Sequence, residues 1–132
     1  MRFIDSNVFI YILTGSPQAS FETSQNILKR IEDGEEAVTS TAIIQEVADW
    51  LEYNGRRQDL RTFIIAVNSY ICLHKATVSW EDMLSAIDYM NAHNIDYVDA
   101  LTLQLMKRNN VKEIYSNDKD FDRAEWVRRI WK

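Results

Sequence analysis

Strand-like residues give way to a cluster of acids in the stretch Ile114-Tyr115-Ser116-Asn117-Asp118-Lys119-Asp120-Phe121-Asp122. The β-type run from Val111 to Tyr115 stops at Ser, Asn and three aspartates spaced two apart. Asn and Asp end strands because their side chains bond the neighbouring backbone. We therefore expect the acids to cluster at the carboxyl end of a strand, where an open α/β sheet binds its ligands.

Composition is that of an ordinary globular chain. With 132 residues, 46% hydrophobic and 27% charged, it predicts a single domain over residues 1–132. No apolar run reaches the ~20 residues that span a bilayer, and no signal peptide opens the sequence. The single cysteine, Cys72, excludes an internal disulfide and favours the cytoplasm. A net charge of −5 disfavours a broad basic face for duplex DNA but does not exclude RNA.

Short apolar runs alternate with helical stripes along the chain, which predicts an α/β fold. We expect strands at 2–4, 37–39, 70–73 and 111–115, an edge strand at 126–131, and helices at 8–13, 20–33, 41–53, 60–67, 79–90 and from 96 onward. In the helix that begins near Ser79, we expect Met83, Ile87 and Met90 to face inward. Asparagine punctuates the second half of the chain, which has no glycine.

Three further acids stand where apolar segments begin or run. Asp5 follows the strand candidate 2–4, Glu46 lies beside the apolar stripe of helix 41–53, and Asp99 lies near the start of the last long helix. Each has an ordinary structural explanation. Asp5 could be a helix N-cap, Glu46 a solvated edge residue, and Asp99 a first-turn acid favoured by the helix dipole.

Those explanations do not account for the acids fully. Ser6 or Asn7 could cap the first helix in place of the preceding aspartate, and Asp96 is the natural cap for the last helix. Glu46 lies too far from any Ser or Thr cap to form a capping box. Both explanations, structural and functional, remain open for each acid taken singly.

The four acids are more informative as a set. Asp5, Glu46, Asp99 and Asp118 stand at equivalent junctions of successive α/β segments. Two carboxylates about 4 Å apart repel by roughly 4 kcal/mol at an effective dielectric of 20, so a fold rarely gathers several without a cation. No histidine or cysteine joins the set, and oxygen ligands suit Mg²⁺ or Mn²⁺ rather than Zn²⁺. Such ions, held by a few carboxylates, hydrolyse phosphodiesters.

Four segments match, in order, the motifs of a known family. They are Phe3-Ile4-Asp5-Ser6-Asn7-Val8, Ser40-Thr41-Ala42-Ile43-Ile44-Gln45-Glu46-Val47, Tyr97-Val98-Asp99-Ala100-Leu101 and Ser116-Asn117-Asp118-Lys119-Asp120-Phe121. Through them the sequence resembles the PIN-domain ribonucleases over nearly its whole length, and especially the small toxin components of VapBC-type toxin–antitoxin pairs.

The resemblance implies a three-layer α/β/α sandwich with a short, mainly parallel central sheet. It implies an endoribonuclease in which Mg²⁺ or Mn²⁺ is bound, and a hydrolytic water positioned, by Asp5, Glu46, Asp99 and Asp118. Asn7 and Ser116 would orient these carboxylates, and Asp120 would be an accessory acid. Serines at 6 and 116 stand where the family commonly has threonine, and both keep the hydroxyl. A homodimer and an antitoxin bound across the active groove are implied as well.

Other classes fit less well. A haloacid-dehalogenase-like phosphatase needs a second aspartate two residues after the first, where this chain has Asn7. A receiver-type signalling domain needs an acidic pair before its phospho-acceptor and a lysine after its last strand, and neither is evident. A catalytically silent PIN-like module that only binds protein or RNA is the main alternative. The intact acid set argues against it.

The remaining chemistry-bearing side chains have structural interpretations. Cys72 and His74 are expected to pack or to end a strand rather than to bind metal, because only two histidines exist. The tryptophans are expected in the core or in subunit contacts, with Trp126 and Trp131 exposed.

Overall fold

A single five-stranded sheet forms the centre of the computed structural model, which describes residues 1–132. The strands are β1 (Arg2–Ile4), β2 (Ala37–Ser40), β3 (Leu73–Ala76), β4 (Glu113–Tyr115) and β5 (Arg128–Ile130). Every pairing is parallel, in the order β3-β2-β1-β4-β5. The chain therefore builds outward from β1 to one side and then crosses to build on the other side, which makes the β1–β4 boundary a topological switch point.

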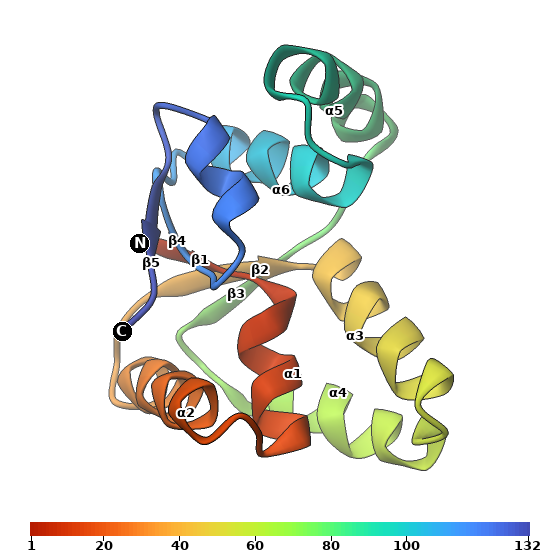
Figure 1. Ribbon diagram of the computed structural model, residues 1–132, viewed down its shortest axis with the longest axis vertical. Coiled ribbons are helices and arrows are strands. Elements are labelled where there is room, and N and C mark those ends of the chain that lie inside the picture. The colour runs from red at the N-terminus through yellow and green to blue at the C-terminus, as the bar shows by residue number, and fades with distance from the viewer.

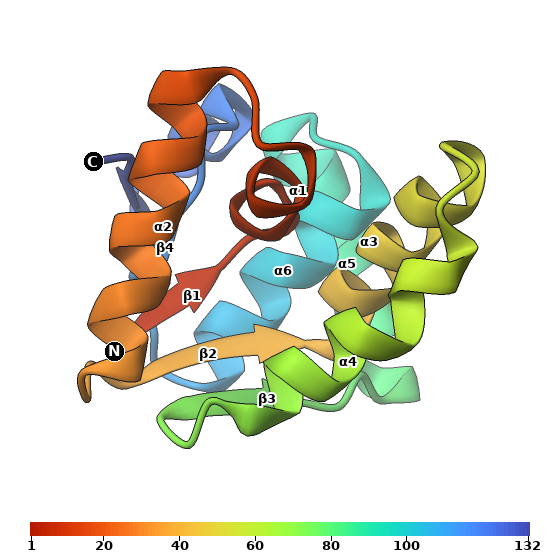
Figure 2. The same cartoon turned by 90° about the horizontal axis from the view of Figure 1, so that it is seen from below.

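Helices cover both faces of the sheet, as the sequence predicted. They are α1 (Ser6–Thr14), α2 (Gln18–Glu32), α3 (Thr41–Tyr53), α4 (Leu60–Ser69), α5 (Trp80–His93) and α6 (Tyr97–Arg108), with 3-10 turns η1 (Arg57–Asp59) and η2 (Lys119–Arg123). Figure 1 shows α1 and α2 on one side of the sheet and α6 on the other, with α5 packed on the outer side of α6. Seen from below, α1 lies between α2 and the α3–α4 pair (Figure 2). The expected three-layer α/β/α sandwich is confirmed. No helix combines the length and the apolar character needed to cross a bilayer.

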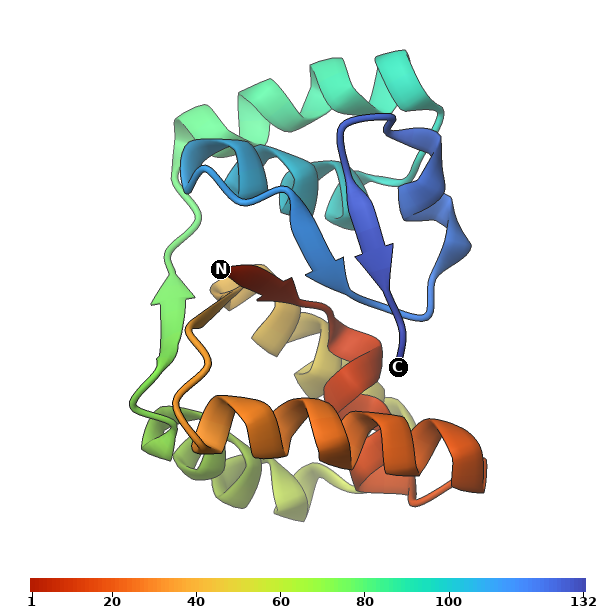
Figure 3. The ribbon, with the colours of Figure 1, turned by 90° about the vertical axis from the view of Figure 1, so that its left-hand side faces the viewer.

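The core forms where both faces of β1 are covered. Phe3 and Ile4 point to opposite faces, and both are fully buried. Helix α6 lies between the sheet and α5 (Figure 3), which explains why it is buried on most of its circumference. Its buried residues are Asp99, Ala100, Leu101, Thr102, Leu103, Leu105 and Met106.

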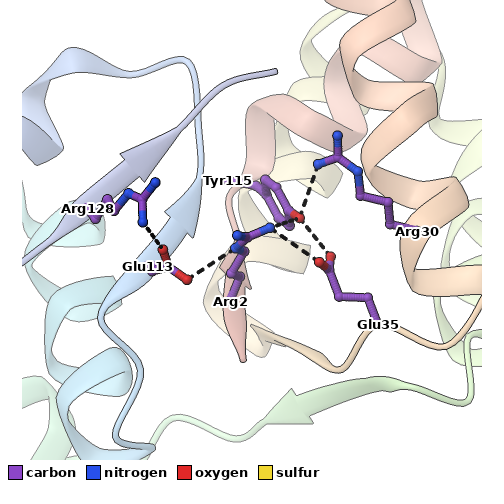
Figure 4. Close-up of polar contacts among 6 residues, drawn as sticks. All are labelled: Arg2, Arg30, Glu35, Glu113, Tyr115 and Arg128. Atoms are coloured by element: carbon purple, nitrogen blue, oxygen red, sulfur yellow. Dashed lines mark hydrogen bonds and ion pairs between the residues drawn. The ribbon is translucent and has the colours of Figure 1, made fainter.

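A network of polar side chains links the central strands of the sheet to α2 (Figure 4). The fully buried Tyr115 donates its hydroxyl to Glu35 at 2.7 Å and accepts from Arg2 and Arg30. Glu113 accepts from Arg2 at 3.3 Å and from Arg128 at 3.1 Å. These bonds join β1, β4 and β5 to α2 and to the turn that follows it, and so hold the strand ends in register.

One expectation about elements is wrong, and a second is wrong in part. The third strand runs over Leu73–Ala76 rather than 70–73, because the apolar residues from Tyr70 form a turn in which the Leu73 N–H donates to the Tyr70 carbonyl. The buried face of α5 contains Asp82 and Ala86. Met83 and Met90 pack against the core as expected, whereas Ile87 is 48% exposed. Arg108 of α6 binds Asp82 and turns that side of the helix inward.

The expected core packing is found for Trp50, but the expected exposure of Trp126 and Trp131 is not. Trp80 is 78% exposed, whereas Trp126 and Trp131 are partly buried and pack against the core, as does Trp50. Trp131 contacts the ring of Tyr11 with centroids 5.5 Å apart. Trp126 and Trp131 therefore do not form an exposed apolar surface.

Candidate active site

The site begins at the switch point, where β1 and β4 end side by side. The Asp5 N–H donates to the Tyr115 carbonyl at 3.1 Å, which places Asp5 beside Ser116. Asp5 Oδ1 accepts from the Ser6 N–H at 2.8 Å, and Oδ2 accepts from the Ser116 hydroxyl at 2.6 Å and from Asn7 at 3.2 Å. Asp5 is thus the N-cap residue of α1, but one of its oxygens also accepts a hydrogen bond from Ser116, the residue that follows β4.

Burial is the main influence on the Asp5 carboxyl. It raises the pKa of Asp5 to about 7, the hydrogen bonds from Ser116 and Ser6 oppose the rise, and the charges of Glu46 and Asp118 add to it. Glu46 on α3 and Asp118 in the segment after β4 are therefore near enough for their charges to act on Asp5.

Asp99 enters the same space from the first turn of α6. Its backbone N–H donates to the Asp96 side chain at 3.0 Å, so Asp96 is the helix cap, as predicted. The Asp99 carboxylate makes no reciprocal bond, and its Oδ2 is buried without any hydrogen-bond partner. Burial, followed by the charges of Asp96, Asp5, Asp118 and Glu46, raises the pKa of Asp99 to about 8.

The acidic loop after β4 brings two further carboxylates close to that of Asp99. The Asp118 N–H donates to the Ser116 hydroxyl at 3.0 Å, and Asp118 Oδ1 accepts from the Asp120 N–H at 2.9 Å at the start of η2. This turn brings one oxygen from each of Asp99, Asp118 and Asp120 within 4.8 Å of one another. Asp120 therefore lies closer to the centre of the site than its expected accessory role implied.

Glu46 borders the group from α3. Burial raises its pKa, and the charges of Asp96, Asp118 and Asp49 raise it further. Asp96 and Asp49 thus add negative charge at the rim, a contribution that sequence reasoning missed. The signal was available for Asp49, which lies three residues after Glu46 and hence on the same side of the helix.

The structure brings the predicted acids together as a central group and two flanking residues. Asp99, Asp118 and Asp120 form the compact group of carboxylates, while Asp5 and Glu46 flank it. Asn7 and Ser116 both contact Asp5, and Asn7 also accepts from the Asn117 N–H at 3.3 Å. Cys72 and His74 lie outside this site, and His74 pairs with Glu36.

Comparison with solved structures finds the same fold in bacterial toxins. The Mycobacterium tuberculosis toxin VapC20, described as cleaving the sarcin–ricin loop, has 17% sequence identity and a TM-score of 0.78, with 96% of this chain and 97% of that chain covered. A toxin–antitoxin complex from Klebsiella pneumoniae has 15% identity, a TM-score of 0.71 and coverage of 97% and 96%. VapBC2 of Rickettsia felis, bound to a promoter DNA fragment, has 13% identity, a TM-score of 0.73 and coverage of 99% and 98%.

At these identities the solved structures establish the fold alone. A comparison with curated protein sequences found no significant match. The family model of the PIN domain, however, matches residues 2–127, which is nearly the whole chain and includes all four motifs. The chain therefore belongs to the PIN-domain family.

Proposed function

We propose that this protein is a divalent-metal-dependent endoribonuclease and the toxin of a type II toxin–antitoxin pair. The observation that carries the proposal is the Asp99 carboxylate, whose Oδ2 is buried without a partner and lies among other acids. A buried carboxylate without a donor is costly unless it is protonated or meets a cation. The carboxylates of Asp118 and Asp120, within 4.8 Å, supply further oxygens for one.

The donor set fits a hard cation. Asp99, Asp118 and Asp120 would hold Mg²⁺ or Mn²⁺, with Asp5 and Glu46 completing the acidic wall, because all of these ligands are oxygens. When bound, such an ion activates water and neutralises charge on a phosphoryl group. Ser116 and the Ser6 N–H orient Asp5 beside this position, so that its carboxylate can hold a water or receive its proton.

A cleavage assay tests this proposal. The protein should cut single-stranded RNA in Mg²⁺ or Mn²⁺, and EDTA should stop the reaction. Asp5→Asn, Asp99→Asn and Asp118→Asn should each lower the rate by about 10²-fold or more, since each removes charge that the reaction uses. Asp33→Asn, far from the site and paired only with Lys29, is the matched control. Full activity in all three site variants would overturn the assignment, and a protein inert under every condition would favour a silent binding module.

We further propose that the protein is a homodimer that uses α5. Trp80, Leu84 and Ile87 are 78%, 68% and 48% exposed, and their spacing puts them on one side of the helix. An exposed apolar stripe of this kind is typical of a protein–protein interface. This stripe replaces Trp126 and Trp131, which pack against the core, as the proposed contact surface.

The proposed regulatory partner is an antitoxin encoded beside this gene. Two of the similar structures are a toxin–antitoxin complex and a VapBC pair, which supports a partner of this class. The acidic site also favours inhibition by a basic side chain, because a guanidinium would take the place of the cation. The product of the adjacent reading frame should bind the protein and suppress RNA cleavage, and binding without inhibition would contradict this part of the proposal.

Cytoplasmic location is proposed from the single free cysteine, Cys72.

A further inference from the structure

The segment that carries Asp118 and Asp120 lies between β4 and β5, and the buried side chain of Phe121 anchors its middle in the core. Beyond Ser116, whose N–H donates to the Ile130 carbonyl at 3.2 Å, it leaves the sheet and curls through η2. The distances among the site carboxylates therefore depend on this anchor and on whatever fixes the two ends of the segment.

Arg129 of β5 contacts both ends. Its Nε and Nη2 donate to the two carboxylate oxygens of Asp122 at 3.0 and 3.2 Å, and its Nη1 donates to the Ser116 carbonyl at 3.3 Å. A two-bond guanidinium–carboxylate pair fixes orientation as well as distance. A single side chain thus spans the acidic segment from residue 116 to residue 122.

Ser116, which Arg129 holds at the start of the segment, makes three hydrogen bonds in the site. The Ser116 hydroxyl donates to Asp5 and accepts from the Asp118 N–H and from Asn7. A shift of the Ser116 backbone would therefore move Asp5 and Asp118 relative to each other. At the far end, Asp122 follows Asp120 by two residues within the same short turn.

Arg128 provides a neighbouring comparison. Its side chain is 71% exposed and binds Glu113 (Figure 4), at the amino end of β4. The Arg129 side chain is only 18% exposed, and alternation along the strand sends it to the opposite face. The two arginines have the same charge and adjacent positions, but only Arg129 contacts the acidic segment.

We propose that Arg129 is a positioning residue that sets the affinity of the site for its divalent cation by clamping the acidic segment at Ser116 and Asp122. The inference rests on the proposed function, because it assigns a role in the same site. Arg129 contacts none of the clustered carboxylates itself, so it acts through the residues that it holds. Groups that bond directly to metal ligands typically change metal affinity or activity by about 10- to 100-fold when removed, and Arg129, which acts one contact further out, is expected at the lower end of this range.

A direct contact with RNA phosphate is the competing role for an arginine near a nuclease site. The geometry disfavours it, because three nitrogens of the guanidinium already donate to Asp122 and Ser116 and the side chain is largely buried. The two roles predict different measurable effects. A phosphate contact weakens RNA binding with or without metal, whereas a clamp changes the metal concentration that the protein requires.

The experiment compares R129Q, R129K and D122N with R128Q as the matched control. Each metal-stripped protein is titrated with Mn²⁺, and the half-saturating concentration is read from the rise in melting temperature and, separately, from cleavage of single-stranded RNA. RNA binding in EDTA is measured in parallel. D122N keeps the bond to the Ser116 carbonyl, so it tests the clamp even if R129Q does not fold.

We expect R129Q to raise the half-saturating Mn²⁺ concentration by about 10-fold in both readouts, with cleavage largely restored at saturating metal. R129K and D122N should give smaller rises, because each keeps part of the clamp, and R128Q should match the wild type. An R129Q protein with the wild-type half-saturating concentration, or with weaker RNA binding in EDTA as its only defect, overturns the inference alone. A wild type that neither binds Mn²⁺ nor cleaves RNA overturns the proposed function and this inference with it.

Discussion

Asp82 and Asp99 occupy the same position, the third residue, in consecutive helices, yet their surroundings are opposite. Burial favours the protonated form of Asp82, but hydrogen bonds from the Ser79 N–H, Gln104 and Arg108 outweigh it and hold the pKa of Asp82 below its usual value. Asp99 has no such donors, and burial among other acids raises its pKa to about 8. The same helix position is structural in one case and, in our account, a cation ligand in the other.

Ser116 offers a test of how the site sets the charge of Asp5. Its hydrogen bond lowers the pKa of Asp5 against the larger effect of burial. Ser116→Ala should therefore raise that pKa above about 7. Because the carboxylate then forms only at higher pH, the acidic limb of the pH profile of kcat/KM should move toward alkaline pH. Ser116→Thr keeps the hydroxyl and should leave the limb in place. A profile unchanged by the alanine substitution would mean that Asp5 does not set this limb.

The sequence identifies the acids but not their spacing. Asp5, Asp99 and Asp118 were found because each stands where a strand ends or a helix begins, which the local pattern records. The closeness of Asp120 was not predictable, because it depends on the 3-10 turn that begins when Asp118 caps the Asp120 N–H. The clamp by Arg129 was hidden for a similar reason, since its partners are 7 and 13 residues away in sequence.

Helices α5 and α6 are held together by a polar lock rather than by apolar packing alone. Arg108 binds both oxygens of Asp82 and the Thr77 carbonyl, while Ser79 and Asp82 form a capping box. Met83 and Met90 pack against the core as apolar periodicity predicted, but the same periodicity missed Asp82. This charged residue faces inward because its partner, Arg108, lies on the next helix. Apolar patterning succeeded for α3, because the apolar stripe expected in helix 41–53 includes its buried residues, Ile43, Val47 and Leu51.

The lock predicts a loss of stability that is independent of metal. Asp82→Ala removes one half of the capping box and takes the carboxylate away from Arg108, which keeps only its bond to the Thr77 carbonyl. It should lower the free energy of unfolding by about 2 kcal/mol. The loss is limited because the Arg108 side chain is 44% exposed and regains water. Glu81→Ala, in the same first turn but exposed, is the control and should change little. Urea unfolding in EDTA and in Mg²⁺ gives both values. An Asp82→Ala loss that depends on metal would tie α5 to the site instead.

Sheet topology is what converts distant acids into one site. Residues near the two ends of the chain meet because β1 and β4 are parallel neighbours whose carboxyl ends coincide. The alternation of strands and helices was sufficient to predict a parallel sheet with its acids at one edge. Local patterning could not predict which strands are adjacent, or that β3 begins at Leu73, because both depend on contacts across the molecule.

The exposed stripe on α5 predicts the assembly of the whole molecule. Leu84→Glu should convert the proposed dimer to a monomer, since a charge in the centre of an apolar interface is left without a partner. Ile71 is 95% exposed but isolated in a turn, so Ile71→Ser serves as the control and should leave the dimer intact. Light scattering at tens of micromolar distinguishes the two. A wild-type monomer at that concentration, or a dimer that survives Leu84→Glu, would exclude this interface.

Thermal melts of the wild type and Asp99→Asn, in EDTA and in Mg²⁺, test the central claim most directly. Asp99 is buried with an unpartnered oxygen among like charges, so Asp99→Asn should leave the metal-free protein as stable as the wild type or more stable. Mg²⁺ at ten times its Kd should add about 1.4 kcal/mol to the wild type, which is a rise in Tm of about 3–8 °C. The variant should gain much less. If Asp99→Asn melts lower than the wild type in EDTA and gains as much from Mg²⁺, Asp99 is a structural residue and the proposed metal site is wrong.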